Sequence, residues 1–318
     1  MTLVAGAREN QADMPLWTSW VEHWVKPVSG PLGMGLLRLL GPRTHGTLGI
    51  LMYHRVAPIT AGFAPPTWNV TPDRFRHQLQ GLLQMGYQGW SLRQALAHNR
   101  TGQPFPARVF VITFDDGYEN LIHHAWPVLR DLRLPATVFV ATSYLDSQVP
   151  FPFDKWKAAG SLQVPVESWR PLTSDQCREM AADGLIEIGA HTHTHADFRN
   201  RPAEFMADLR ASVDVLAERF GFLEPTFAFP YGRRKLGFAG PPLSEAARNS
   251  GVICALTTES DLNRSGSDPF DWGRFTVTQA DLPATISTKL SGWYAAARFA
   301  WRLVGQPRWL ARRQHSRS

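Results

Sequence analysis

Short apolar runs alternate with amphipathic stretches along most of this chain. The runs are residues 48–53, 109–114, 136–141, 185–190, 226–229, 252–256 and 274–277. Each run is short and mostly apolar, which is typical of strands that are buried on both faces of a parallel sheet. The pattern predicts an α/β fold with about seven parallel strands, arranged as a (β/α) barrel or as an open doubly wound sheet.

Helix signals fill the intervals between these runs. Thr71 followed by Pro72 marks a helix start, and Thr173 with Gln176 has the pattern of a capping box. The predicted helices cover residues 71–83, 91–98, 202–220 and 243–250, and another ends near residue 132. The regular alternation favours one domain over residues 46–282.

Three segments depart from the alternation. Residues 1–45 are predicted to be an N-terminal helical extension, because Trp17, Trp20 and Trp24 recur at helical spacing before Pro and Gly interrupt. Residues 143–170 form a loop-like insertion that is rich in Pro, Trp and Phe. Residues 283–318 are predicted to be a basic amphipathic tail, largely one helix.

The basic charge of the chain is concentrated in this tail. The net charge is +6, and residues 283–318 contain seven basic residues and no acidic one, so the rest is nearly neutral. Trp293 and Trp301 share an apolar helical face that two arginines flank, a pattern typical of a helix on anionic lipid. Two interpretations follow: a peripheral contact with an anionic membrane through residues 289–313, or packing of both Trp onto the barrel. Nucleic acid is not an expected partner, because the body is not basic and has no recognition motif.

The cysteines and the N-terminus bear on the compartment. Cys177 and Cys254 are too few for a disulfide framework, and Cys254 lies in an apolar run. Residues 1–14 carry charges and lack the apolar stretch of a signal peptide, and no run reaches the ~20 residues of a membrane span. These features predict a cytoplasmic protein, peripheral at the inner face of the membrane.

Candidate chemistry first occurs where the run 109–114 ends, at Asp115 and Asp116. Two adjacent carboxylates beside a buried strand repel each other unless a cation or a proton resolves the repulsion. Successive side chains of a strand point to opposite faces, so the two cannot do the same work. One can bind a cation while the other acts as a base. The alternative is an ordinary turn at Asp-Asp-Gly.

His191 and His195 follow the predicted strand 185–190. If they lie on a helical turn, both imidazoles share a face and reach one ion. Two His and one Asp leave positions open on a divalent metal, which is typical of a catalytic site. The alternative is a surface or capping role for the pair.

Three motifs resemble, in order and spacing, those of the polysaccharide deacetylases, the NodB-homology enzymes of carbohydrate esterase family four. They are Thr-Phe-Asp-Asp-Gly at 113–117, His-Thr-x-x-His at 191–195 and Phe-Pro-Tyr-Gly at 229–232. The resemblance covers residues 46–280 and implies a distorted (β/α) barrel. It also implies removal of N-acetyl, or sometimes O-acetyl, groups from polymers of N-acetylglucosamine or related sugars.

The resemblance assigns roles to the matching residues. Asp115 would be the general base, and the backbone N–H of Tyr231, after Pro230, would help to stabilise the oxyanion. The ligands of a divalent metal, Zn²⁺ in the first place or else Co²⁺ or Ni²⁺, would be Asp116, His191 and His195. The implied reaction is metal-assisted hydrolysis of an amide.

The chain departs from the family pattern in its later motifs. Ala228 stands where the third motif usually has the Arg that orients the catalytic Asp, and Arg274 is the candidate to replace it from another strand. Asp271 and Trp272 fit the fourth motif, Asp-x-x-Asp-Trp, which implies a place beside the substrate. The fifth motif, Leu-x-x-His, which supplies the usual catalytic acid, is absent.

His54 is the candidate for the missing acid. It follows Tyr53 at the end of the first predicted strand, so it should face the same rim as Asp115. A Tyr-His pair ahead of the Asp pair resembles the exopolysaccharide-associated branch of the family. The alternatives are a hydrogen-bonded loop residue for His54 and an ordinary structural arginine for Arg274.

The combined pattern predicts a metal-dependent hydrolase that deacetylates a polysaccharide or a lipid-linked glycan in surface or exopolysaccharide synthesis. The aromatic side chains of the insertion 143–170 are expected to shape its groove. One alternative is a catalytically degenerate deacetylase fold that binds glycan, indicated by Ala228 and the absent fifth motif. Another is a relative that cleaves an amide outside the sugars.

Overall fold

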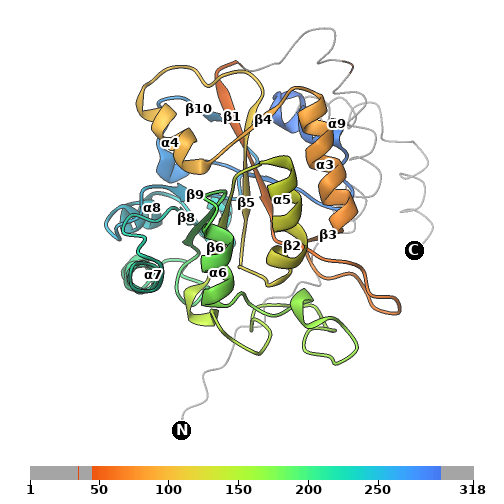
Figure 1. The fold of residues 1–318 in the computed structure, drawn as a ribbon. Helices are drawn as coiled ribbons and strands as arrows, with labels where there is room; N and C mark the ends of the chain where they lie inside the picture. Colours follow the sequence, from red (N-terminus) through yellow and green to blue (C-terminus); the bar gives the residue numbers. More distant parts are fainter. Residues whose placement is uncertain (1–34, 36–44, 295–318) are drawn as a thin grey trace, which may run out of the picture.

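Parallel strands form the wall of a distorted barrel (Figure 1). In the computed structural model, the described residues are 35 and 45–294. Six neighbouring strands are β1 (Thr47–Tyr53), β5 (Val109–Phe114), β6 (Ala136–Val140), β7 (Ile186–Ala190), β8 (Phe227–Ala228) and β9 (Ala255–Leu256). The seventh, β11 (Phe275–Thr276), pairs with β1, and a parallel bridge between Leu256 and Trp272 joins β9 to the segment before β11. This bridge closes the ring, so the barrel is confirmed rather than the open sheet.

Four short strands lack the apolar runs that predict the others. β4 (Gln88–Trp90) pairs in parallel with β5, and β10 (Asn263–Arg264) pairs antiparallel with the start of β1. β2 (Arg55–Val56) and β3 (Asn69–Val70) form a separate two-stranded sheet. They enclose the loop 57–68, which lies on the same side of the barrel as the insertion 143–170 (Figure 1).

Helices cover the outside of the barrel (Figure 1). They are α3 (Pro72–Gln84), α4 (Leu92–Arg100), α5 (Trp126–Leu132), α6 (Ser174–Ala181), α7 (Pro202–Phe220), α8 (Pro241–Arg248) and α9 (Pro283–Leu290), with a π-helix, η3 (Leu121–Ala125), before α5. The predicted capping box is present, because the Gln176 N–H donates to the Thr173 hydroxyl and the Thr173 N–H donates to the Gln176 side chain. Helix α8 begins two residues before the predicted start, because Pro241 is well suited to a first turn.

Strand alternation separates the barrel interior from the layer under the helices. On β5, Val109 and Val111 belong to an inner apolar cluster, whereas Phe110, Ile112 and Phe114 pack in the larger outer cluster. The inner cluster also contains Leu48, Ile50, Phe139, Ala228, Leu256 and Trp272. Asp115 has the parity of the inward series, so its side chain is placed at the mouth of the barrel interior.

The predicted boundary between domain and tail at residue 282 is wrong. Helix α9 packs on α3 and β1, and the Lys289 ammonium is buried, where it forms an ion pair with Asp281 (2.9 Å) and donates to the Thr276 carbonyl (2.9 Å). Leu290 packs closely on Gly49: a Cβ on Gly49 would lie 2.3 Å from Cδ2 of Leu290. Residues 283–290 therefore belong to the barrel domain, because their apolar face completes its core.

The same packing bears on the predicted membrane contact through residues 289–313. Lys289 is 2% exposed and is not available to a lipid surface. Residues 295–313, with most of the predicted apolar face, lie outside the described residues, as do the tryptophans of the N-terminal extension. In the described part of the chain, no helix has the length and apolar character needed to cross a membrane.

Candidate metal centre and active site

Asp115 and Asp116 are directed to different partners, as their adjacency on a strand requires. Asp115 is buried and paired with Arg274, whose Nη1 lies 2.6 Å from Oδ1 and whose Nη2 lies 2.9 Å from Oδ2. The guanidinium also donates to the Thr113 hydroxyl (3.2 Å) and the Thr257 carbonyl (3.1 Å). Arg274 therefore lies where an arginine that orients Asp115 is needed. Its guanidinium is buried, with all of these hydrogen bonds.

Asp116 is turned toward the two histidines of the second motif. Its Oδ1 lies 3.6 Å from Nε2 of His191 and 3.4 Å from Nε2 of His195. One donor atom from each of the three residues lies within 4.8 Å of the others, and all three residues are buried. In the described part of the chain, this is the only such group of three.

The donor set fits a divalent metal such as Zn²⁺. Nδ1 of His191 lies 2.8 Å from the Ala228 carbonyl, which can only accept, so Nδ1 carries the proton and Nε2 presents its lone pair. Burial lowers the pKa of His191 to about 4, against the opposing effect of Asp115 and Asp116, so the ring is neutral. A neutral imidazole with an outer partner and an ionised carboxylate are the ligands that Zn²⁺ accepts.

Both carboxylates are held ionised. Burial by itself would raise the pKa of Asp115, but the charge of Arg274 and its hydrogen bonds lower it below its usual value. Burial opposes ionisation of Asp116 as well, but its hydrogen bond with His195 is the largest of the interactions that lower its pKa. Each Asp therefore has its own cationic or polar partner, which relieves the repulsion between them.

The predicted helical turn for His191 and His195 is wrong, because both lie on a loop after β7. Thr192 and His195 have positive φ values of 62° and 55°, which a right-handed helix does not allow. The His195 N–H donates to the Thr192 hydroxyl (3.0 Å). Asp208 of α7 accepts from the N–H groups of His193 (2.7 Å) and Thr194 (3.1 Å). These bonds replace the helical ones and bring the two imidazoles together.

Backbone strain is concentrated at this site. Asp116 (φ 73°) and Tyr231 (φ 61°) are each the central residue of a γ-turn, closed by Gly117 N–H to Asp115 O (3.0 Å) and by Gly232 N–H to Pro230 O (2.6 Å). Positive φ in residues other than Gly costs free energy and often marks functional sites. In the sequence, the glycine that follows each of these residues, Gly117 or Gly232, indicates the tight turn.

Tyr231 and His54 lie on the segments that follow β8 and β1. The Tyr231 ring packs edge-on against His195 at 5.0 Å between centroids, and 45% of its surface is exposed. His54 follows β1, is half-buried and stacks on Trp68, with centroids 5.7 Å apart. The sequence gives no signal for Trp68, because an isolated Trp in a Pro-rich loop belongs to no periodic pattern.

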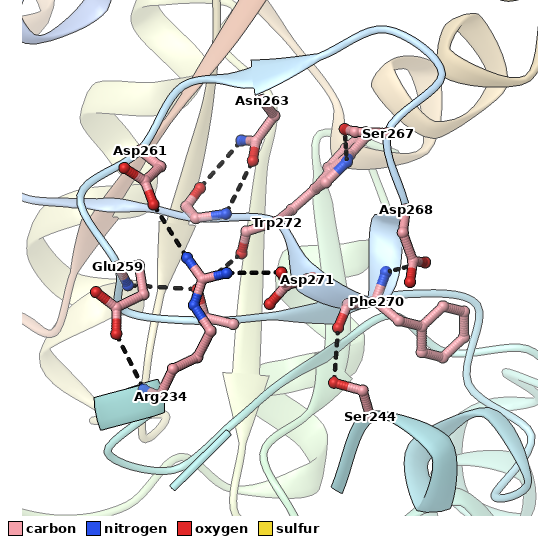
Figure 2. A network of polar contacts seen from close by, with 12 residues as sticks. Arg234, Ser244, Glu259, Asp261, Asn263, Ser267, Asp268, Phe270, Asp271 and Trp272 are labelled. Carbon is pink, nitrogen blue, oxygen red and sulfur yellow. Dashed lines mark hydrogen bonds and ion pairs between the residues drawn. The ribbon is translucent and has the colours of Figure 1, made fainter. Parts of the chain in front are cut away.

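Asp271 and Trp272 are not brought to the metal centre. Trp272 is 1% exposed, so it cannot contact a substrate, and its indole N–H donates to the Ser267 hydroxyl (3.0 Å). Asp271 accepts a hydrogen bond from Arg234 (2.6 Å). Figure 2 shows both residues in a polar network with Arg234, Asp261 and Asn263. The fourth motif here closes the barrel seam, because the bridge to Leu256 lies at Trp272.

Known proteins have sequences similar to part of this chain. Residues 102–239, which include all three motifs, match the family model described as polysaccharide deacetylase. The poly-beta-1,6-N-acetyl-D-glucosamine N-deacetylase of Escherichia coli (strain K12) is 33% identical over 124 residues, 39% of this chain and 18% of that protein. The protein of the same name from Staphylococcus aureus (strain MSSA476) is 26% identical over 174 residues, 52% of this chain and 54% of that protein. The chain spans about half, or less, of the length of these relatives.

Solved structures with the same barrel cover more of the chain. IcaB from Ammonifex degensii has a TM-score of 0.61 and 26% identity, over 78% of this chain and 97% of that one. The deacetylase PplD of Streptococcus pyogenes, in complex with acetate, has a TM-score of 0.63 and 21% identity, over 78% and 99% of the two chains, and shows the same fold. The barrel that carries the Asp-His-His cluster therefore has the fold of these deacetylases. Residues 102–239 thus carry a polysaccharide deacetylase domain, and the barrel around them is similar to that of IcaB.

Proposed function

We propose that this protein is a metal-dependent hydrolase that removes acetyl groups, N-acetyl in the first place, from a polysaccharide or lipid-linked glycan in surface or exopolysaccharide synthesis. The observation that carries the proposal is the separation of two carboxylates. Asp116 faces two imidazoles, whereas Asp115 is held apart by Arg274. Amide hydrolysis of this kind needs a metal ligand and a base that is not a ligand.

The residues that would hold the metal are Asp116, His191 and His195. When bound, a divalent metal supplies a Lewis acid that polarises a carbonyl and makes water more acidic. Asp115 is the base in this proposal. Both of its oxygens accept from Arg274, yet each keeps a lone pair, so the carboxylate can still take a proton from water. Arg274 fixes the carboxylate plane by two parallel bonds.

The third motif is the proposed donor to the oxyanion. Tyr231 lies at the centre of a γ-turn after β8, beside His195. A backbone N–H that is held in a strained turn does not need to reorganise when negative charge develops, which is the requirement for an oxyanion donor. The Tyr231 ring covers one edge of His195 and leaves nearly half of its own surface open to a substrate.

Release of acetate tests the proposal directly. The names of the curated relatives indicate β-1,6-linked N-acetyl-D-glucosamine oligosaccharides as the first substrates to assay. We expect acetate from these substrates, loss of the activity after chelation and recovery when Zn²⁺ is added back. Binding of the oligosaccharide without any acetate would instead support the degenerate glycan-binding alternative, which Ala228 and the absent fifth motif motivate. Acetate released only from amides outside the sugars would support the remaining alternative, a relative that cleaves such amides.

His54 is the proposed general acid. Replacing His54 by Ala should lower kcat about 10²–10⁴-fold, the usual contribution of a positioned acid or base. The leaving amine needs a proton, and His54 follows the end of β1, which pairs with the end of β5, directly before Asp115. Steady-state kinetics with metal content measured in parallel checks this prediction. An unchanged kcat would leave His54 as a structural residue that supports Trp68.

A further inference from the structure

Two loops at the mouth of the barrel are joined by the buried guanidinium of Arg55. Arg55 is 1% exposed and forms an ion pair with Asp154, whose side chain is fully buried. It also donates to the Thr67 carbonyl (3.0 Å) and the Thr67 hydroxyl (2.8 Å). Thr67 belongs to the loop 57–68 and Asp154 to the insertion 143–170, so one side chain holds both loops.

Trp156 ties the same two loops together a second time. Its indole N–H donates to the Ala64 carbonyl (2.9 Å), and its backbone N–H donates to Asp154 Oδ1 (2.9 Å). Trp156 is buried in a small apolar cluster of the insertion, against which Phe63 packs. A buried ion pair holds its geometry strongly, because removal of one partner leaves the other charge without compensation. The two loops are therefore built as one rim.

Each residue that Arg55 binds lies next to an aromatic side chain that stacks on a histidine of the site. Phe153, before Asp154, stacks on His195 with centroids 3.8 Å apart and planes at 19°. Trp68, after Thr67, stacks on His54 with planes at 22°. The Arg55–Asp154 ion pair thus positions one aromatic ring against a predicted metal ligand and another against the proposed acid.

Trp68 differs from Phe153 in its exposure. More than half of its surface, 53%, is exposed, although its backbone is held at a φ of 55° and its carbonyl accepts from the Arg55 N–H. A large apolar ring that is kept in water on a strained backbone costs free energy twice, through the unburied surface and through the strain. With one face on His54, the indole has its other face open, which indicates a ligand.

We propose that the open face of Trp68 is a platform for a pyranose ring of the substrate chain, next to the sugar that loses its acetyl group. The inference rests on the proposed function. The C–H groups on one face of a pyranose form an apolar surface that packs on an aromatic ring. The Arg55–Asp154 ion pair is the positioning element that holds the platform over His54.

The topology places this platform on one flank of the metal ligands. Trp68 lies beside His54, at the end of β1, and β1 neighbours the strand that carries Asp116. Tyr231 lies on the opposite flank, because β8 neighbours the strand that carries His191. A ring on Trp68 would therefore lie to one side of the predicted metal ligands, which suits a ligand of at least two sugar units.

Kinetics on substrates of two lengths tests the platform. In Trp68→Ala, the ratio of kcat/KM for a β-1,6-linked N-acetylglucosamine tetramer to kcat/KM for the monomer should fall about 10–100-fold, mainly through KM. Trp68→Tyr should recover part of the ratio, because it restores a smaller ring. Leu162→Ala, at an exposed apolar side chain of the insertion, is the matched control and should change neither substrate. An equal loss on both substrates would mean that Trp68 only supports His54, and no loss would remove it from the site.

The positioning role has its own measurement. Asp154→Asn should raise KM for the tetramer, and it should add little further loss when Trp68 is already Ala, because both changes remove one contact. Additive losses would contradict coupling through the ion pair. If the wild-type protein releases no acetate from any glycan, the proposed function fails, and calorimetric titration with the tetramer still tests the platform. Equal affinity of the wild type and Trp68→Ala would then overturn it.

Discussion

Replacing Asp115 by Asn should lower the rate of acetate release about 10²–10⁴-fold while the protein keeps its metal. Asn has the size of Asp but cannot take a proton from water. Asp115 is directed to Arg274 and not to the imidazoles, so the three predicted ligands are untouched. Single-turnover kinetics and elemental analysis of the same sample check the two parts of the prediction.

Controls separate the loss of the base from a loss of structure. The Asn amide would face one N–H group of Arg274, so circular dichroism must first show that Asp115→Asn is folded. Arg274→Lys keeps the positive charge but not the two parallel bonds, and its rate should lie between those of the wild type and Asp115→Asn. Normal turnover by folded Asp115→Asn would remove Asp115 from the role of base, and loss of metal would show that it is a ligand.

Replacing His191 by Ala should remove most of the bound metal and, with it, the activity. A change in an outer partner of a metal ligand already lowers affinity about 10–100-fold, and His191 is one of three direct donors, so the loss should exceed 10²-fold. Dialysis against limiting Zn²⁺, followed by elemental analysis, measures the metal that each variant retains.

His193 is the matched control for this experiment. It lies on the same loop between the two ligands, but its Nδ1 is 2.9 Å from the Thr142 hydroxyl and it is not part of the ligand cluster. His193→Ala should therefore retain metal close to the wild-type level. Equal metal in His191→Ala and the wild type, or equal loss in His191→Ala and His193→Ala, would contradict the assignment.

Features that depend on neighbours in the chain were predictable. The apolar runs correspond to the seven strands of the barrel, because a strand buried on both faces must be continuously apolar. The different partners of Asp115 and Asp116 follow from the alternation of side chains on β5. Gly117 and Gly232 mark the two strained turns of the site.

Local patterns were misleading where tertiary contacts decide the backbone. The spacing of His191 and His195 suits a helical turn, but Asp208 of α7 accepts the N–H groups of the intervening residues and holds a loop. The basic tail suggested a separate segment from residue 283, yet Lys289 is neutralised by Asp281 inside the fold. In each case a partner far from the local pattern supplies the stabilising bond.

By itself, the sequence determined the alternation of strands and helices and the different directions of the Asp115 and Asp116 side chains, because these rest on periodicity and on the alternation of neighbours in a strand. Only the tertiary structure decided which arginine pairs with Asp115, since Arg274 lies 159 residues away. It also decided that Trp272 is buried and Trp68 exposed, although both are tryptophans near polar residues. Burial depends on how the ring closes and how the rim loops are joined, and no local pattern encodes that closure.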